Sequence, residues 1–160
     1  MASNWIHQEL AIVATIDPVA MSTTGATTST SNLWTDAIDM DVFEKAVFIV
    51  MVNTIAASSG LTLTVYSDGA SATGGMTSAI ATSTTLLNAD DDEQQWIEID
   101  TEDMNPDGRD RYVRAQLVLA PTAGTAASAT AVAVLGLGGR CRYQPASNYD
   151  LASVTQITTS

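Results

Sequence analysis

The chain has 160 residues, of which 46% are apolar and 15% are charged, and its formal net charge is −12 at pH 7. This length and composition predict one globular domain with a core of its own. The negative charge disfavours nucleic acid as a partner, because phosphate binding relies on Lys and Arg, and a single His and a single Cys leave few groups for catalysis.

The beginning of the chain carries no signal for export. The first ten residues contain no Lys, no Arg and no long apolar stretch, so we expect synthesis in a cytoplasm. The longest strictly apolar run, residues 46–52, is much shorter than the roughly 20 residues that cross a bilayer, so no membrane span is expected. A single Cys141 allows no disulfide within the chain.

Residues 4–13 alternate in a way that predicts an extended arm or an edge strand. We expect this segment to end near Asp17 and Pro18, and residues 1–18 to be removable without loss of the fold. Residues 21–32 are nearly all Ser, Thr, Ala and Gly, a composition that predicts a loop or linker.

Period-two patterns follow at short intervals from Leu33 onward. The run 45–53 is continuously apolar and rich in β-branched residues, which predicts a central strand buried on both faces. Trp96 is expected to cover one edge of the core. The other predicted strands span residues 33–38, 61–66, 76–81, 84–87, 95–100, 111–120 and 127–137.

The connections between these strands favour an all-β fold. Asp68 and Gly69 predict a hairpin or a corner after the strand 61–66. About eight strands with short turns, and no segment with the period of an amphipathic helix, predict an antiparallel β-sandwich of the jelly-roll type.

We divide the chain into an N-terminal arm and Ser/Thr-rich linker (1–32), a β-sandwich domain (33–139) and a C-terminal tail (140–160). Terminal segments of this kind become ordered by docking on another surface, and both contain more large apolar residues than a solvated tail requires. The residues that we expect to contact other subunits are Trp5, Ile6, Leu10, Ile12 and Tyr149.

Three arginines form a second candidate contact region. Arg109, Arg111 and Arg114 surround Tyr112, and guanidinium groups beside an aromatic ring often contribute to interfaces. The alternative is that they balance the charges of Asp107 and Asp110 at the end of a strand.

Two acidic segments are candidates for cation binding. Asp103, Asn105 and Asp107 match the first half of an EF-hand calcium loop, but Arg114 stands where the closing Glu should be, which favours a simple type I turn. The acidic run 90–93 is expected to be a solvated loop. We therefore predict no cofactor and no metal.

The order of residues 43–50, 61–69 and 111–115 resembles small structural proteins of tailed phages and prophages, of the head-decoration or capsid-stabilising (cement) kind. The resemblance covers residues 33–143, including the closing strand 131–137 and the basic boundary 140–142. Residues 70–75 depart from the pattern, and residues 1–32 lie outside it.

This resemblance implies a jelly roll or sandwich that binds the outside of an assembled capsid and bridges its capsomers without covalent bonds. It implies the major capsid protein and neighbouring copies of the chain as partners, as a homo-trimer or clustered copies on the virion surface. An alternative is a carbohydrate- or receptor-binding module of a phage tail or fibre, acting through an exposed aromatic such as Trp34 or Tyr66. An enzyme, such as a glycosidase using Glu98 and Asp100, is disfavoured.

Overall fold

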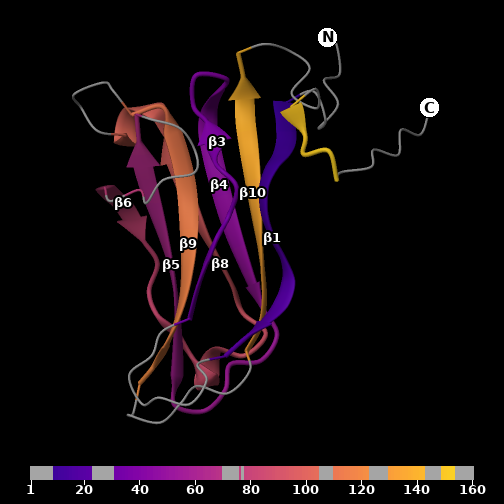
Figure 1. Ribbon diagram of the computed structural model, residues 1–160, viewed down its shortest axis with the longest axis vertical. Coiled ribbons are helices and arrows are strands. Elements are labelled where there is room, and N and C mark those ends of the chain that lie inside the picture. Colours follow the sequence, from indigo (N-terminus) through magenta and orange to yellow (C-terminus); the bar gives the residue numbers. More distant parts are fainter. Residues whose placement is uncertain are drawn as a thin grey trace.

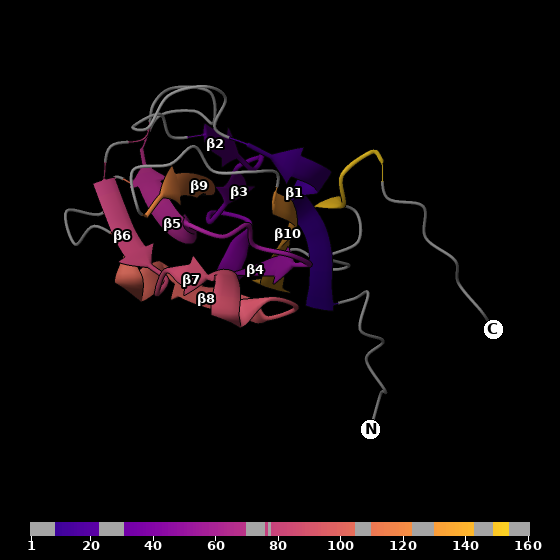
Figure 2. The ribbon, with the colours of Figure 1, turned by 90° about the horizontal axis from the view of Figure 1, so that it is seen from below.

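The computed structural model describes residues 9–22, 31–69, 76, 78–104, 110–122, 130–142 and 149–153. Within these ranges the strands form two antiparallel sheets that pack face to face (Figures 1 and 2). Sheet A has the strand order β1-β10-β4-β8, and sheet B has the order β2-β9-β5-β6, with β3 paired to β9 and β7 paired to β5. The strands are β1 (Leu10–Met21), β2 (Ser31–Trp34), β3 (Ile38–Asp39), β4 (Phe43–Val52), β5 (Ser59–Asp68), β6 (Ser78–Thr82), β7 (Leu86–Leu87), β8 (Gln94–Asp100), β9 (Tyr112–Pro121) and β10 (Thr130–Cys141).

The strand pairing is that of a jelly roll. The first strand pairs with the last, β2 and β3 pair with β9, β4 pairs with β8, and β5 pairs with β6 and β7. These four pairs behave as one long hairpin folded over on itself, and the pairs β10·β4 and β9·β5 join them into two sheets. The predicted sandwich is therefore confirmed, as is the hairpin after Asp68, since Tyr66 pairs with Ala79.

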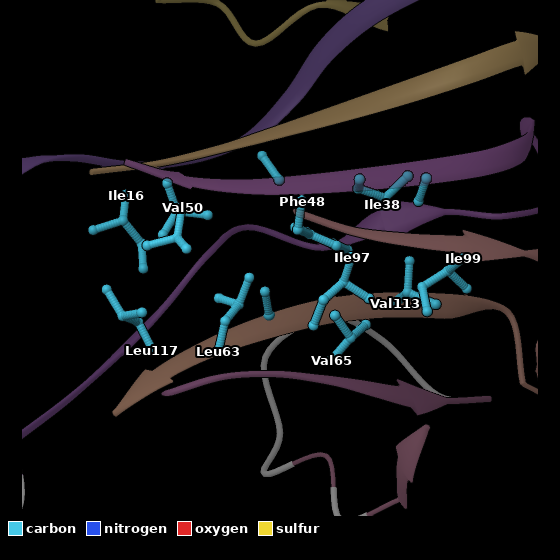
Figure 3. Close-up of a cluster of buried hydrophobic side chains, with 14 of the residues drawn as sticks. Ile16, Ile38, Phe48, Val50, Leu63, Val65, Ile97, Ile99, Val113 and Leu117 are labelled. Carbon is cyan, nitrogen blue, oxygen red and sulfur yellow. The ribbon is translucent and has the colours of Figure 1, made fainter. Parts of the chain in front are cut away.

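The core lies between the sheets, where alternate residues of each strand point inward (Figure 3). Side chains that are at most 9% exposed come from both layers. Among them are Ile16, Phe48, Val50, Ile97 and Ile99 from sheet A, and Ile38, Leu63, Val65, Val113 and Leu117 from sheet B.

The N-terminal strand confirms the edge-strand alternative for the described part of residues 4–13 and corrects the predicted end near Pro18, since β1 runs to Met21. β1 pairs with β10 along sheet A, and Ala11, Val13, Ala14 and Ile16 are buried in the core. The strand continues past Pro18 because β1 lies at the edge of the sheet, where a missing N–H costs no ladder hydrogen bond. A shift of register between Ile16 and Val19 absorbs the irregularity, so deletion of residues 1–18 would remove most of a core strand.

Two other strand boundaries differ from the prediction. The strand expected over 33–38 is interrupted at Thr35, whose buried hydroxyl accepts a hydrogen bond from the Ala115 N–H at 3.1 Å. β10 does not end at Gly139. It passes through Arg140, whose φ is +50°, and continues to the buried Cys141.

Residues 149–153 lie along the free edge of β1. The Leu151 N–H donates to the Ile12 carbonyl at 2.8 Å, and the Ile12 N–H donates to Oδ1 of Asp150 at 2.6 Å. The ring of Tyr149 packs edge-on against Phe43, with 5.8 Å between the centroids. This part of the predicted tail therefore docks on its own sandwich.

Candidate interaction surface

The outer face of sheet A carries two adjacent rows of apolar side chains. The register places Ile12 beside Leu137 and Leu137 beside Val47, and it places Leu135 beside Ile49 and Ile49 beside Trp96. Directly opposed side chains on one face of a sheet are about 5 Å apart at Cβ. The first row therefore joins β1, β10 and β4, and the adjacent row joins β10, β4 and β8. We call this surface the apolar band, formed by Leu10, Ile12, Val47, Ile49, Met51, Trp96, Leu135 and Leu137.

The apolar band is open to solvent in the part of the chain that the structure describes. The Trp96 side chain is 75% exposed, and Leu10 and Met51 are each 39% exposed. The other members are half-buried by one another. A contiguous apolar surface of this kind marks a protein interaction site more often than isolated exposed residues do.

Two sequence predictions are therefore wrong for this sheet. β4 buries only one face, with Phe48 and Val50 inside and Val47 and Ile49 outside, and Trp96 does not cover the core. The continuous apolar run did signal that both faces of β4 are apolar. The pattern of this run does not show that the described residues cover only one of the two faces of β4.

The single lysine of the chain borders the apolar band. Lys45 Nζ lies 2.9 Å from Oε1 of Glu98 and 3.1 Å from Oδ2 of Asp100, across the β4·β8 pair. Its hydrogen bonds to Glu98 and Asp100 raise the pKa of Lys45, and the bond from Lys45 lowers the pKa of Asp100. These three charges lie at one end of the apolar band, where Lys45 offsets one of the two carboxylates.

The predicted contact residues lie on two different faces. Leu10 and Ile12 belong to the apolar band, whereas Arg111 and Arg114 lie on sheet B or directly before β9. Trp5, Ile6 and Arg109 lie outside the described residues. Among the described residues, Arg111 and Arg114 thus lie on a different sheet from Leu10 and Ile12.

Arg114 belongs to an aromatic cluster on sheet B. Its guanidinium lies 5.1 Å from the centre of the Trp34 ring, and Nε donates to the Thr35 carbonyl. The Trp34 ring also packs against Tyr66 with 5.2 Å between the centroids, and Tyr66 Oη donates to Oε1 of Gln116 at 3.2 Å. Arg114 is thus held by contacts within its own chain.

Arg111 forms a two-pronged ion pair with Asp39. Nε donates to Oδ1 at 2.8 Å and Nη2 donates to Oδ2 at 2.5 Å, while Asp41 lies 3.1 Å from Nε. The guanidinium also lies 5.1 Å from the centre of the Tyr112 ring. The carboxylates beside Arg111 are thus Asp39 and Asp41, whereas Asp110 accepts a hydrogen bond from the Ser67 hydroxyl at 2.6 Å.

The Asp39→Asn variant should be destabilised at neutral pH by less than about 1 kcal/mol, because the Arg111 side chain is 45% exposed and solvent screens the pair. The hydrogen bond from Arg111 lowers the pKa of Asp39 below its ordinary value of 3.8. The carboxylate therefore stabilises the fold above that pH, and its contribution disappears as the pH falls through the lowered pKa.

Urea unfolding of wild type and Asp39→Asn at neutral pH and at about pH 2 checks this prediction. The difference in unfolding free energy between the two proteins should vanish in acid. Asp41→Asn serves as the control and should have a smaller effect, since Asp41 is 65% exposed and forms one contact with Arg111. A difference that persists in acid would contradict the ion-pair explanation.

The acidic segments have structural roles where they are described. Asp103 Oδ2 accepts from the Asp100 N–H at 2.9 Å, closing a short helical turn after β8, while Asn105 and Asp107 lie outside the described residues. In the acidic run, Asp90 accepts from the Leu87 N–H and Asp91 from the Ile55 N–H, so these carboxylates anchor turns. The described residues contain no group of three metal-ligating side chains, and no helix among them is long and apolar enough to span a membrane.

Neither a protein-family model nor a curated protein matches the chain. Among solved structures, a chain of the T13 infectious bursal disease virus particle superposes with a TM-score of 0.53 at 13% identity, over 86% of this chain and 33% of that one. A chain of the Gx strain of this virus superposes with a TM-score of 0.48 at 16% sequence identity, over 86% of this chain and 33% of that one. A chain of Bacillus endospore appendages, a family of disulfide-linked pili, superposes with a TM-score of 0.37 at 18% sequence identity, over 87% of this chain and 96% of that one.

The chain thus spans about a third of the length of the viral chains that it matches. At these identities the similarity concerns the fold: this chain is a jelly-roll-like sandwich similar to a protein of a viral particle.

Proposed function

We propose that this protein is a virion structural protein that binds the outside of an assembled phage capsid and stabilises it by bridging capsomers without covalent bonds. The observation that carries the proposal is the apolar band on the outer face of sheet A, with Trp96 75% exposed at its margin. Its partners are the major capsid protein and neighbouring copies of the chain, and its location is the virion surface after synthesis in the bacterial host cytoplasm.

The shape and charge of the molecule fit this role. Val47 and Ile49 are β-branched and Trp96 has only two side-chain torsions, so these residues lose little side-chain entropy when a second flat surface covers them. The net charge of −12 would keep the protein away from packaged nucleic acid and favour docking beside basic groups of a shell. Many copies, each contributing a modest binding energy, can hold a lattice together.

The copy number of the chain in purified particles tests the proposal. We expect quantitative mass spectrometry to find it in a fixed, lattice-like ratio to the major shell protein, because a bridging protein occupies every equivalent position. A few copies per particle would favour a tail or fibre protein, and absence from particles would overturn the proposal.

Carbohydrate or receptor binding on a phage tail or fibre is the second candidate function. Trp34 does not favour it, because Arg114 and Tyr66 already contact its ring. The exposed Trp96 does, since it borders a shallow depression that also contains hydroxyl and amide side chains, from Ser83, Thr84, Gln94 and Gln95. Binding to a glycan array that is lost in Trp96→Ala, without association with shells, would select this function.

A further inference from the structure

A groove lies on the outer face of sheet A at the end of the apolar band, where β1 and β4 finish, and the two share Met51. It has a volume of about 460 Å³ and contains residues of β1, β10 and the end of β4. The residues whose side chains or backbone form it include Pro18, Val19, Ala20, Met51, Ala131 and Ala133.

The groove arises from the sizes of its side chains. The middle strand, β10, presents only the methyl groups of Ala131 and Ala133, with Ala20 beside Ala131. On one flank lies Met51, which pairs with Ala133 and is 39% exposed, and on the other lies the ring of Pro18. The register shift between Ile16 and Val19 raises Pro18 at one side. Two larger walls around a floor of small residues give a hollow suited to a bulky apolar side chain.

We propose that this groove binds the segment around Trp5 and Ile6 of a neighbouring copy of the same chain. This inference rests on the proposed function, since it requires copies that lie side by side, and it names the contact between them. Trp5 and Ile6 are the large apolar pair in the residues that precede β1. The groove carries no charged side chain, so it would accept them without desolvating an ion.

The length of the chain favours a neighbouring copy over the chain's own groove. Along β1, Val19 lies nine residues from Leu10, which is roughly 30 Å of strand. To return along the sheet, the segment before Leu10 must first reverse its direction, which uses at least about two residues. The remaining three residues up to Trp5 cover only about 10 Å, so Trp5 ends well short of its own groove.

The resulting contact is head-to-tail. The segment leaves one copy at the start of β1 and enters the next copy at the end of β1, so donor and acceptor surfaces differ. Such heterologous contacts form rings or extended arrays, because every copy keeps one donor and one acceptor available. The contact would therefore link neighbouring copies around a symmetry position of a shell.

Cysteine cross-linking between full-length chains tests the inference. One chain carries Asn4→Cys, which keeps Trp5 and Ile6, and the other carries Ala131→Cys. Both carry Cys141→Ala to remove the native thiol, and oxidised glutathione is the oxidant. At micromolar concentration the mixed pair should form its disulfide at least about tenfold faster than a pair with Ala79→Cys, because docking raises the local thiol concentration toward the order of millimolar. Ala79 is the matched control, since it is an exposed alanine on a strand of sheet B.

Equal rates with Ala131→Cys and Ala79→Cys would overturn the inference. Faster disulfide formation between two Ala131→Cys chains would also overturn it, because the grooves of two copies would then face each other. So would capture of Ile157→Cys, a position near the C-terminus of the chain, in place of Asn4→Cys. Circular dichroism of each variant establishes that it is folded. Because this experiment needs no particle, its failure leaves the copy number in particles, and thus the proposed function, as a separate question.

Discussion

The Gly138→Ala variant should have an unfolding free energy about 2 kcal/mol lower than that of wild type. For a domain of this size, this loss corresponds to a fall of roughly 6 °C in Tm. A Cβ added to Gly138 would lie 2.7 Å from Cγ and from Cδ1 of Phe43. The Phe43 ring is 2% exposed and packs against Tyr149, so it has little freedom to move away. Urea unfolding of wild type and Gly138→Ala measures the loss.

Gly139→Ala is the matched control for Gly138→Ala. The neighbouring glycine lies in the same strand, but its added Cβ would be 3.3 Å from Cδ2 of Leu10, the end of a flexible and 39% exposed side chain. Neither glycine has a left-handed φ, so backbone strain does not distinguish the two sites. We expect a change within about 0.5 kcal/mol for Gly139→Ala, and equal effects of the two substitutions would contradict the packing argument.

Trp96→Ala should weaken binding to capsids by roughly 30-fold, since an aromatic residue that becomes buried at an interface typically contributes about 2 kcal/mol. Trp96 is 75% exposed and packs beside Ile49, so its removal should change the stability of the free protein by less than about 0.5 kcal/mol. Titration of capsids that lack this protein with wild type and Trp96→Ala measures the difference.

Leu87→Ala is the control for Trp96→Ala. Leu87 is also an exposed large apolar residue, at 45%, but it lies on β7 of the other sheet. Its removal should leave capsid binding unchanged. If Trp96→Ala binds as tightly as wild type, or if Leu87→Ala weakens binding equally, the apolar band is not the docking surface.

Much of the strand content follows from short-range patterns. The strict alternation in residues 61–66 predicts β5, and the Asp68–Gly69 pair predicts the reversal toward β6, because side-chain period and turn chemistry act between close neighbours in the chain. The same reasoning failed at Pro18. A local rule treats proline as a stop, but the edge position of β1 removes the cost of its missing N–H.

The candidate surface was only partly predictable. The sequence predicts Leu10 and Ile12 as contact residues, and these two lie on the apolar band. It assigns Val47, Ile49 and Trp96 to the core. Alternation shows which residues share a face of a strand, but it does not show which face meets the second sheet. Where both faces are apolar, as in β4, the pattern does not separate the face that the chain buries from the one that it leaves open.

The sequence by itself determined that this is an acidic all-β domain with few chemically reactive groups, since composition and local period depend on the residues alone. Only the tertiary structure decided that β1 pairs with β10, that the Arg114 side chain covers Trp34, and that the apolar band lies outside. These features join residues from about 50 to 130 positions apart, and their pairing depends on how the whole set of strands buries its apolar surface at once.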